Sequence, residues 1–171
     1  MIDVSVELNR LSDLDELSGP AAAAVLRAEG WSGGRRHPVK EWATTWQRGD
    51  AWAWIQGDGP PVQVEFTVWH QDVEDEWPGP DTYIDDLYDA ASAELPRLVA
   101  QLESGHLETR LRTSDEDLTN GADYIEHAAW RVGDKVVLAG VKHDDVEVPV
   151  QLVVVVRDHA VDAEDDGGEW L

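Results

Sequence analysis

The clearest amphipathic pattern in the chain runs through residues 81–104. Apolar side chains recur there at spacings of three and four, as one face of an α-helix requires, at positions Ile84, Leu87, Tyr88, Ala91, Leu95, Leu98 and Leu102. Asp81 supplies an N-terminal cap, and Pro96 is expected to kink or restart the helix because proline lacks a backbone donor. The pattern predicts a long helix that packs against a core through one face.

Two segments that precede this helix alternate in the manner of β-strands. In residues 62–70, the apolar positions 62, 64, 66 and 68 alternate with Gln63, Glu65, Thr67 and Trp69, which places the two sets on opposite faces. A shorter alternation spans residues 51–55. Between the two, residues 57–61 read Gly-Asp-Gly-Pro-Pro, which is turn chemistry. The two segments therefore predict an antiparallel hairpin.

Three further strands are expected after the helix, over residues 125–132, 135–141 and 146–157. Gly133-Asp134 and His143-Asp144-Asp145 mark the turns that join them. Residues 152–156 are almost wholly apolar, which is typical of a central strand covered on both faces.

The N-terminal third predicts helices and loops. Ser12-Asp13-Leu14-Asp15 resembles a capping-box start, residues 21–29 form a helical run, residues 31–37 are expected to be a loop, and residues 38–48 a further helix. The sequence thus predicts a single α+β domain over residues 1–161, an antiparallel sheet of about five strands with helices packed on one face. Residues 162–171 are expected to form an acidic, flexible C-terminal tail.

The charge of the chain indicates what kind of partner it would bind. The chain has 36 Asp and Glu residues against 13 Lys and Arg residues, a formal net charge of -23. Such a field repels nucleic acid and anionic membranes and attracts basic proteins at rates that fall with salt. The chain has no cysteine, which excludes disulfides and thiolate chemistry. Residues 1–4 show no secretory signal, so the protein is expected to be cytoplasmic.

Candidate chemistry is sparse. His70 and Asp72 with the following acids contain metal-ligand types, but their spacing does not match an EF-hand, and a solvated acidic loop is the favoured interpretation. His143 with Asp145 also contains ligand types, and an acidic turn without a site is favoured there. No nucleophile elbow or phosphate loop is present. Arg35-Arg36 opens a small basic island that is expected to pair with surrounding acids. We therefore expect no cofactor, no bound metal and no catalytic residue.

Nine tryptophans are unusual for this length. On the predicted strand 62–70, Trp69 falls opposite the apolar face, and Trp52 and Trp54 share one face of the preceding strand. Either these tryptophans lie on a binding surface, or a second helix buries them, and both interpretations stay open. Trp77, within an acidic loop, is the stronger candidate for exposure. A tryptophan among carboxylates would suit a basic partner, because Trp can stack on a partner's arginine.

The leading hypothesis is a non-catalytic acidic protein that neutralises a basic partner by occlusion and charge complementarity, as an immunity protein or antitoxin does against a bacterial toxin. The predicted partner-binding residues are Asp72, Glu74, Asp75, Glu76, Trp77, Asp85, Asp86 and Asp89. The alternatives are a DNA mimic that inhibits a nucleic-acid-binding protein, a metal-dependent enzyme that uses His70, Asp72, His143 and Asp145, and a salt-adapted domain whose acidity has no binding role. Direct binding of nucleic acid or membrane is not expected, and the oligomeric state stays open.

Overall fold

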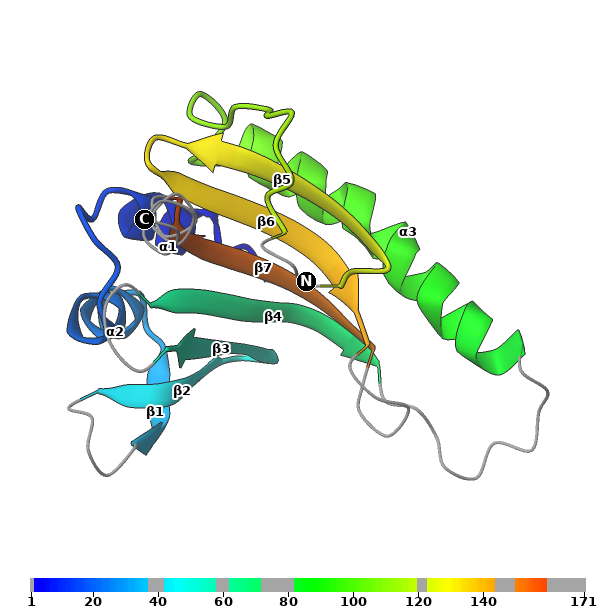
Figure 1. Cartoon of the computed structure of the whole chain (residues 1–171). Helices are drawn as coiled ribbons and strands as arrows, with labels where there is room; N and C mark the ends of the chain where they lie inside the picture. The colour runs from blue at the N-terminus through cyan, green and yellow to red at the C-terminus, as the bar shows by residue number, and fades with distance from the viewer. Residues whose placement is uncertain are drawn as a thin grey trace, which may run out of the picture.

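A computed structural model describes residues 2–36, 42–57, 62–71, 82–119, 123–143 and 150–159. Within these residues the chain folds as one α+β domain. Its antiparallel strands form one sheet in the order β1-β2-β3-β4-β7-β6-β5 (Figure 1). The helices are α1 (Ser5–Ser12), α2 (Gly19–Ala28) and α3 (Thr82–Ser104). The strands are β1 (Ser32–Arg36), β2 (Ala43–Arg48), β3 (Ala51–Gln56), β4 (Gln63–Gln71), β5 (Glu126–Val132), β6 (Lys135–Lys142) and β7 (Val150–Asp158).

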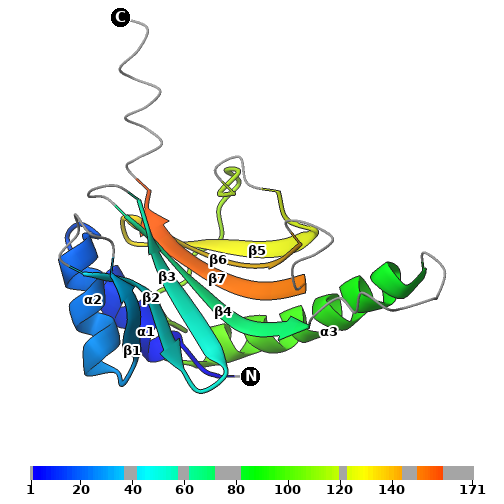
Figure 2. The ribbon, with the colours of Figure 1, turned by 90° about the horizontal axis from the view of Figure 1, so that it is seen from below.

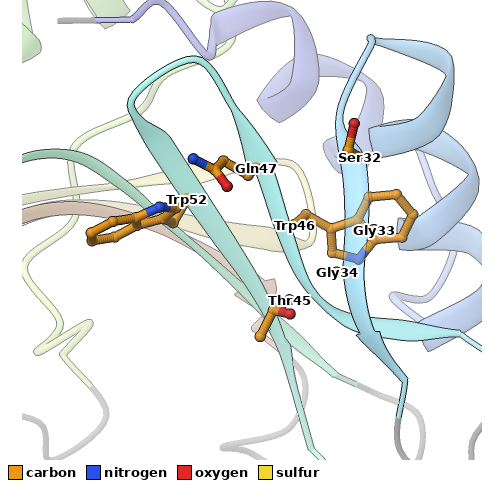
Figure 3. Close-up of a pocket in the computed structure, with 7 residues that line it drawn as sticks. All are labelled: Ser32, Gly33, Gly34, Thr45, Trp46, Gln47 and Trp52. Atoms are coloured by element: carbon orange, nitrogen blue, oxygen red, sulfur yellow. The ribbon is translucent and has the colours of Figure 1, made fainter.

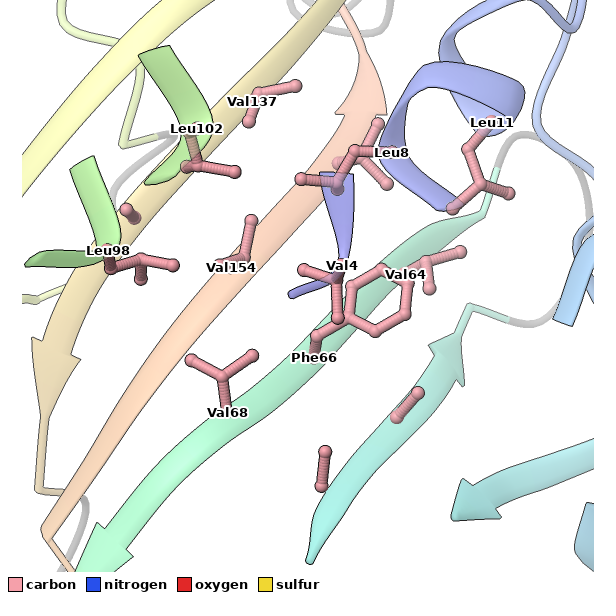
Figure 4. Packing of buried hydrophobic residues seen from close by; sticks show 14 of the residues in the cluster. Val4, Leu8, Leu11, Val64, Phe66, Val68, Leu98, Leu102, Val137 and Val154 are labelled. Atoms are coloured by element: carbon pink, nitrogen blue, oxygen red, sulfur yellow. The ribbon is translucent and has the colours of Figure 1, made fainter. Parts of the chain in front are cut away.

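The helices cover one face of the sheet, as the sequence predicts (Figure 2). The apolar stripe of α3 packs on β4, β7, β6 and β5, α2 packs on β1 and β3, and α1 lies beside α2 against β7. Side chains from the helices and the sheet meet in one core, in which Phe66, Val154, Leu8, Leu98 and Leu102 are fully buried (Figure 4). Burial of these side chains is the main force that holds the sheet to its helices.

The sequence does not predict the two strands at the β1 end, so the described residues form a sheet of seven strands rather than about five. Residues 43–48 form β2 instead of the expected helix, and residues 32–36 form β1 instead of a loop. Arg48 pairs directly with Ala51, which makes Gly49-Asp50 a two-residue hairpin turn with Gly49 at φ +59°. That turn, with the β-branched residues of β2, favours a strand over a helix.

Near the N-terminus the predicted helix start at Ser12 is wrong, because α1 ends at Ser12. The Ser5 N–H donates to the carboxylate of Asp3 just ahead of this helix (2.9 Å). A second helix does begin after the interruption. Ser18 caps α2 by accepting from the Ala21 N–H (3.3 Å), and Pro20 occupies its first turn.

The β3–β4 hairpin and the central strand β7 agree with their predictions, whereas a restart of α3 at Pro96 is not found. Residues 51–55 and 62–70 form the β3–β4 hairpin, in which Ile55 pairs with Val64. Strand β7 lies between β4 and β6, which is the central position that its apolar run requires. Helix α3 continues through Pro96, which lies on its exposed side, so the helix does not restart there.

The sequence placed Trp69 on the wrong face of the sheet. Thr67 pairs with Val153 and Trp69 with Leu152, so Val68 is the extra residue of a β-bulge. One added residue reverses the alternation. Trp69 therefore turns to the helix side, where it is half-buried against the core.

Among the described residues, no helix is both long enough and apolar enough to cross a membrane.

Candidate functional site

The outer side of α3 carries two of the predicted partner-binding residues. Asp86 and Asp89 are exposed one turn apart, while Leu87 and Ala91 between and beyond them are buried against the sheet. Asp85 lies in the same helix, with its side chain outside the described residues. The other predicted partner-binding residues also lie outside the described residues, namely Asp72, Glu74, Asp75, Glu76 and Trp77.

Basic side chains are largely occupied by this chain's own acids. Ion pairs within 3.6 Å hold Arg10, Arg48, Arg97, Arg110, Arg131, Lys135 and Lys142. Arg27 lies over the Trp46 ring (5.7 Å), and Arg157 donates to the Leu118 carbonyl (2.7 Å). With these cations engaged, the exposed carboxylates set the sign of the surface field.

Two buried ionic clusters are structural, and the first joins α1 to β2. Glu7, whose side chain is 1% exposed, accepts from the Trp31 indole (2.8 Å) and pairs with Arg48 (3.0 Å). The Arg48 guanidinium also lies over the Trp31 ring (5.3 Å). The carboxylate is buried because it is both paired and hydrogen-bonded. Three residues so far apart in sequence gave no signal that could have revealed this cluster.

The second cluster centres on Lys135, whose side chain is fully buried at the β5–β6 turn. Its ammonium donates to the Leu14 carbonyl (2.6 Å) and pairs with Asp158 and Asp134, each at 2.9 Å. Burial alone would lower the pKa of Lys135, but hydrogen bonds and attraction from Asp158 and Asp134 outweigh it and raise that pKa. Asp158 also accepts from the Leu17 N–H (3.1 Å), so the cluster fixes the α1–α2 loop to the end of β7.

The histidines proposed as metal ligands have other neighbours. The His70 ring stacks on Trp52 with centroids 4.5 Å apart, and His143 Nδ1 lies 2.8 Å from the Tyr88 hydroxyl. Asp72 and Asp145 lie outside the described residues. Within the parts of the chain that the structure describes, no three His, Asp or Glu side chains gather in a way that would hold a metal ion.

The face of the sheet opposite the helices differs between its two halves. Over β7, β6 and β5, the closed half, the chain that follows α3 crosses in front of the strands (Figure 1). Tyr124 packs against Gly140, where an added Cβ would come 2.6 Å from the ring. Glu116 lies 3.0 Å from His159 Nε2, and the hydrogen bond from His159 lowers the pKa of Glu116.

Over β1, β2 and β3, the open half, Trp52 and Trp54 stay half-exposed in an edge-to-face pair with ring centroids 6.2 Å apart.

A hollow of about 320 Å³ opens at the edge of this open half. It is lined by Ser32, Gly33, Gly34, Thr45, Trp46, Gln47 and Trp52 (Figure 3). The Trp46 indole is held by donation to the Ala43 carbonyl (2.8 Å), and Gly34 keeps the space free because a Cβ there would lie 3.2 Å from Thr45 Oγ1. The lining residues are all neutral. Such a hollow suits insertion of a side chain rather than acid–base chemistry.

A scan against protein-family models, a search of curated proteins and a search of solved structures each found no match to this chain.

Proposed function

We propose that this protein is a cytoplasmic, non-catalytic binding protein that neutralises a basic protein partner by occlusion and charge complementarity, as an immunity protein or antitoxin against a bacterial toxin. One observation carries the proposal. The described basic side chains pair largely with the chain's own acids, while Asp86 and Asp89 stay exposed on α3 in a chain of net charge -23. The field that remains favours a cationic partner.

The acidic side of α3 would act mainly on association. Exposed carboxylates steer a basic partner toward the surface and raise the association rate constant, kon, with little effect on dissociation. Tryptophan anchors such as Trp77 would then slow dissociation by burying aromatic surface. Residues 72–77 precede α3 closely in the sequence, so we include both in one contact surface. A partner held there would be blocked by bulk, with no bond made or broken.

The test uses the partner captured from the source organism's lysate, then purified and identified. Its binding kinetics are measured against the full chain and against a double variant, Asp86→Lys with Asp89→Lys. We expect kon to fall by about tenfold or more at low salt, because steering governs such rates, and the difference to shrink as salt is added.

The matched control is Asp15→Lys with Glu16→Lys, which makes the same charge change at exposed positions of the α1–α2 loop. This control should lower kon much less. Equal effects from the two variants would remove α3 from the site, and an unaltered kon in both would overturn charge steering. If the captured protein binds DNA, and duplex DNA displaces this chain from it, the protein is instead a DNA mimic.

A further inference from the structure

Strand β1 forms one edge of the described sheet. It pairs on one side with β2, and Ser32, Gly33 and Gly34 are exposed. An edge strand presents backbone donors and acceptors along its outer side, which makes it a template for another extended segment. The hollow that Trp52 and Trp46 line adjoins this strand, so an added segment would have a place for one large side chain beside its backbone (Figure 3).

The charge at β1 is opposite to that of the rest of the molecule. The strand ends in Arg35-Arg36, and His37 and Lys40 follow within four residues. The chain as a whole carries a net charge of -23, with acidic residues spread over its length. An occupant of this edge should therefore be acidic, which separates the edge from the surface proposed for a basic partner.

We propose that residues 160–171 of the same chain bind along β1, with Trp170 in the hollow. This segment carries Asp162, Glu164, Asp165, Asp166 and Glu169, followed directly by Trp170 and Leu171. Its acids complement Arg35 and Arg36, and its indole matches a hollow lined by aromatic and small polar groups. The proposal does not depend on the proposed function, because it uses no residue of the acidic side of α3.

The sheet register brings the two ends within reach. Val156 pairs with Val64, Val64 with Ile55, Trp54 with Thr45, and Thr45 with Arg35, so β7 and β1 finish at the same end of the sheet. Four strand spacings separate them, roughly 19 Å at about 4.8 Å each. Twelve residues follow His159, and an extended chain of that length spans up to roughly 40 Å. The segment is therefore long enough to reach the edge of its own sheet.

The absence of cysteine allows a clean test. Gln56→Cys, exposed at the end of β3, and Gly168→Cys each receive a nitroxide label in the otherwise intact chain, and the distance distribution is measured by pulsed electron paramagnetic resonance. Docking predicts a narrow peak, whereas a free segment samples a broad distribution. Arg35→Glu with Arg36→Glu should abolish the narrow peak, as should Trp170→Ala, which leaves the folded domain untouched.

The matched control is Arg97→Glu on exposed α3, whose side chain is 75% exposed, and it should leave the peak unchanged. A broad distribution in the parent protein, or a peak that survives both Arg35→Glu with Arg36→Glu and Trp170→Ala, would overturn the proposal. Diluting the labelled chain with unlabelled chain gives the remaining arm. Persistence of the peak supports docking within one chain, and its loss would place the segment on a second copy and overturn this assignment.

Discussion

The face of the sheet opposite the helices is buried in the closed half and partly exposed in the open half. Leu138, Val155, Glu65 and Trp54 lie in one row across the strands. Leu138 is 2% and Val155 4% exposed, whereas Trp54 is half-exposed. Leu138 and Val155 belong to a buried cluster, and Tyr124, in the chain that follows α3, packs against it. One sheet can thus hold the fold with one half and leave aromatic surface for contact in the other.

The largest effect is expected from Lys135 in the closed half. Lys135→Met should lower the free energy of unfolding by about 3–5 kcal/mol, because Asp158 would keep a buried charge without its partner. Urea denaturation measures this. The control is Asp134→Asn, which removes the 66%-exposed partner of the same ammonium and should cost under about 1 kcal/mol. Equal losses from the two variants would mean that Lys135–Asp158 is not the central pair.

The same pair fixes the direction of a pH effect. The pKa of Lys135 is raised above its ordinary value of 10.5, so its stabilisation is complete below that value and is lost as pH rises through the folded pKa. The difference in unfolding free energy between the parent and Lys135→Met should therefore stay constant at neutral pH and shrink only in alkali. A difference that shrinks below pH 9, roughly a unit and a half under the ordinary pKa, would contradict this.

A smaller effect should separate the two halves directly. Leu138→Ala should cost about 2–5 kcal/mol, since it empties buried space. Replacement of a core tryptophan by alanine lowers the free energy of unfolding by roughly 3–5 kcal/mol. Trp54→Ala, in the same row, should lower it by about half of that or less, because Trp54 is half-exposed. Urea denaturation of the two variants provides the comparison. If Trp54→Ala proves as destabilising as Leu138→Ala, the open half is part of the core rather than a surface for contact.

The smallest effect is expected from metal. Zn²⁺, Mn²⁺ or Ca²⁺ should leave the melting temperature unchanged, because an ion stabilises only where the native state binds it. If a metal ion raises the melting temperature, and Asp72→Asn or His143→Ala removes that rise, the metal-dependent enzyme is favoured instead. The contrast between a structural half and a binding half would then no longer hold.

Local pattern predicted the elements that it controls. The apolar stripe of α3 and the alternation of β3 and β4 predict which face of each element is buried. The apolar run of β7 predicts that both faces of that strand are buried. The helix predicted over residues 38–48 is wrong because Trp42 and Trp46 are four residues apart, a spacing typical of one face of a helix. The Gly49-Asp50 turn, read together with Thr44 and Thr45, was the signal that could have corrected this prediction.

The site was less predictable than the fold. The exposure of Asp86 and Asp89 follows from the helical period alone, so it could be inferred. The bulge at Val68, the Glu7–Arg48 pair and the hollow beside β1 all depend on residues brought together from distant parts of the chain. No pattern within one segment encodes such contacts.

The position of β7 has a consequence for synthesis. This strand follows the other described strands in sequence, yet it lies between β4 and β6. Until the ribosome has made it, both of those strands expose an unpaired edge, and their long-range pairing must wait. A nascent chain that stops before residue 150 would thus present two open templates for aggregation, and folding of the closed half is expected to follow translation of β7 rather than accompany it.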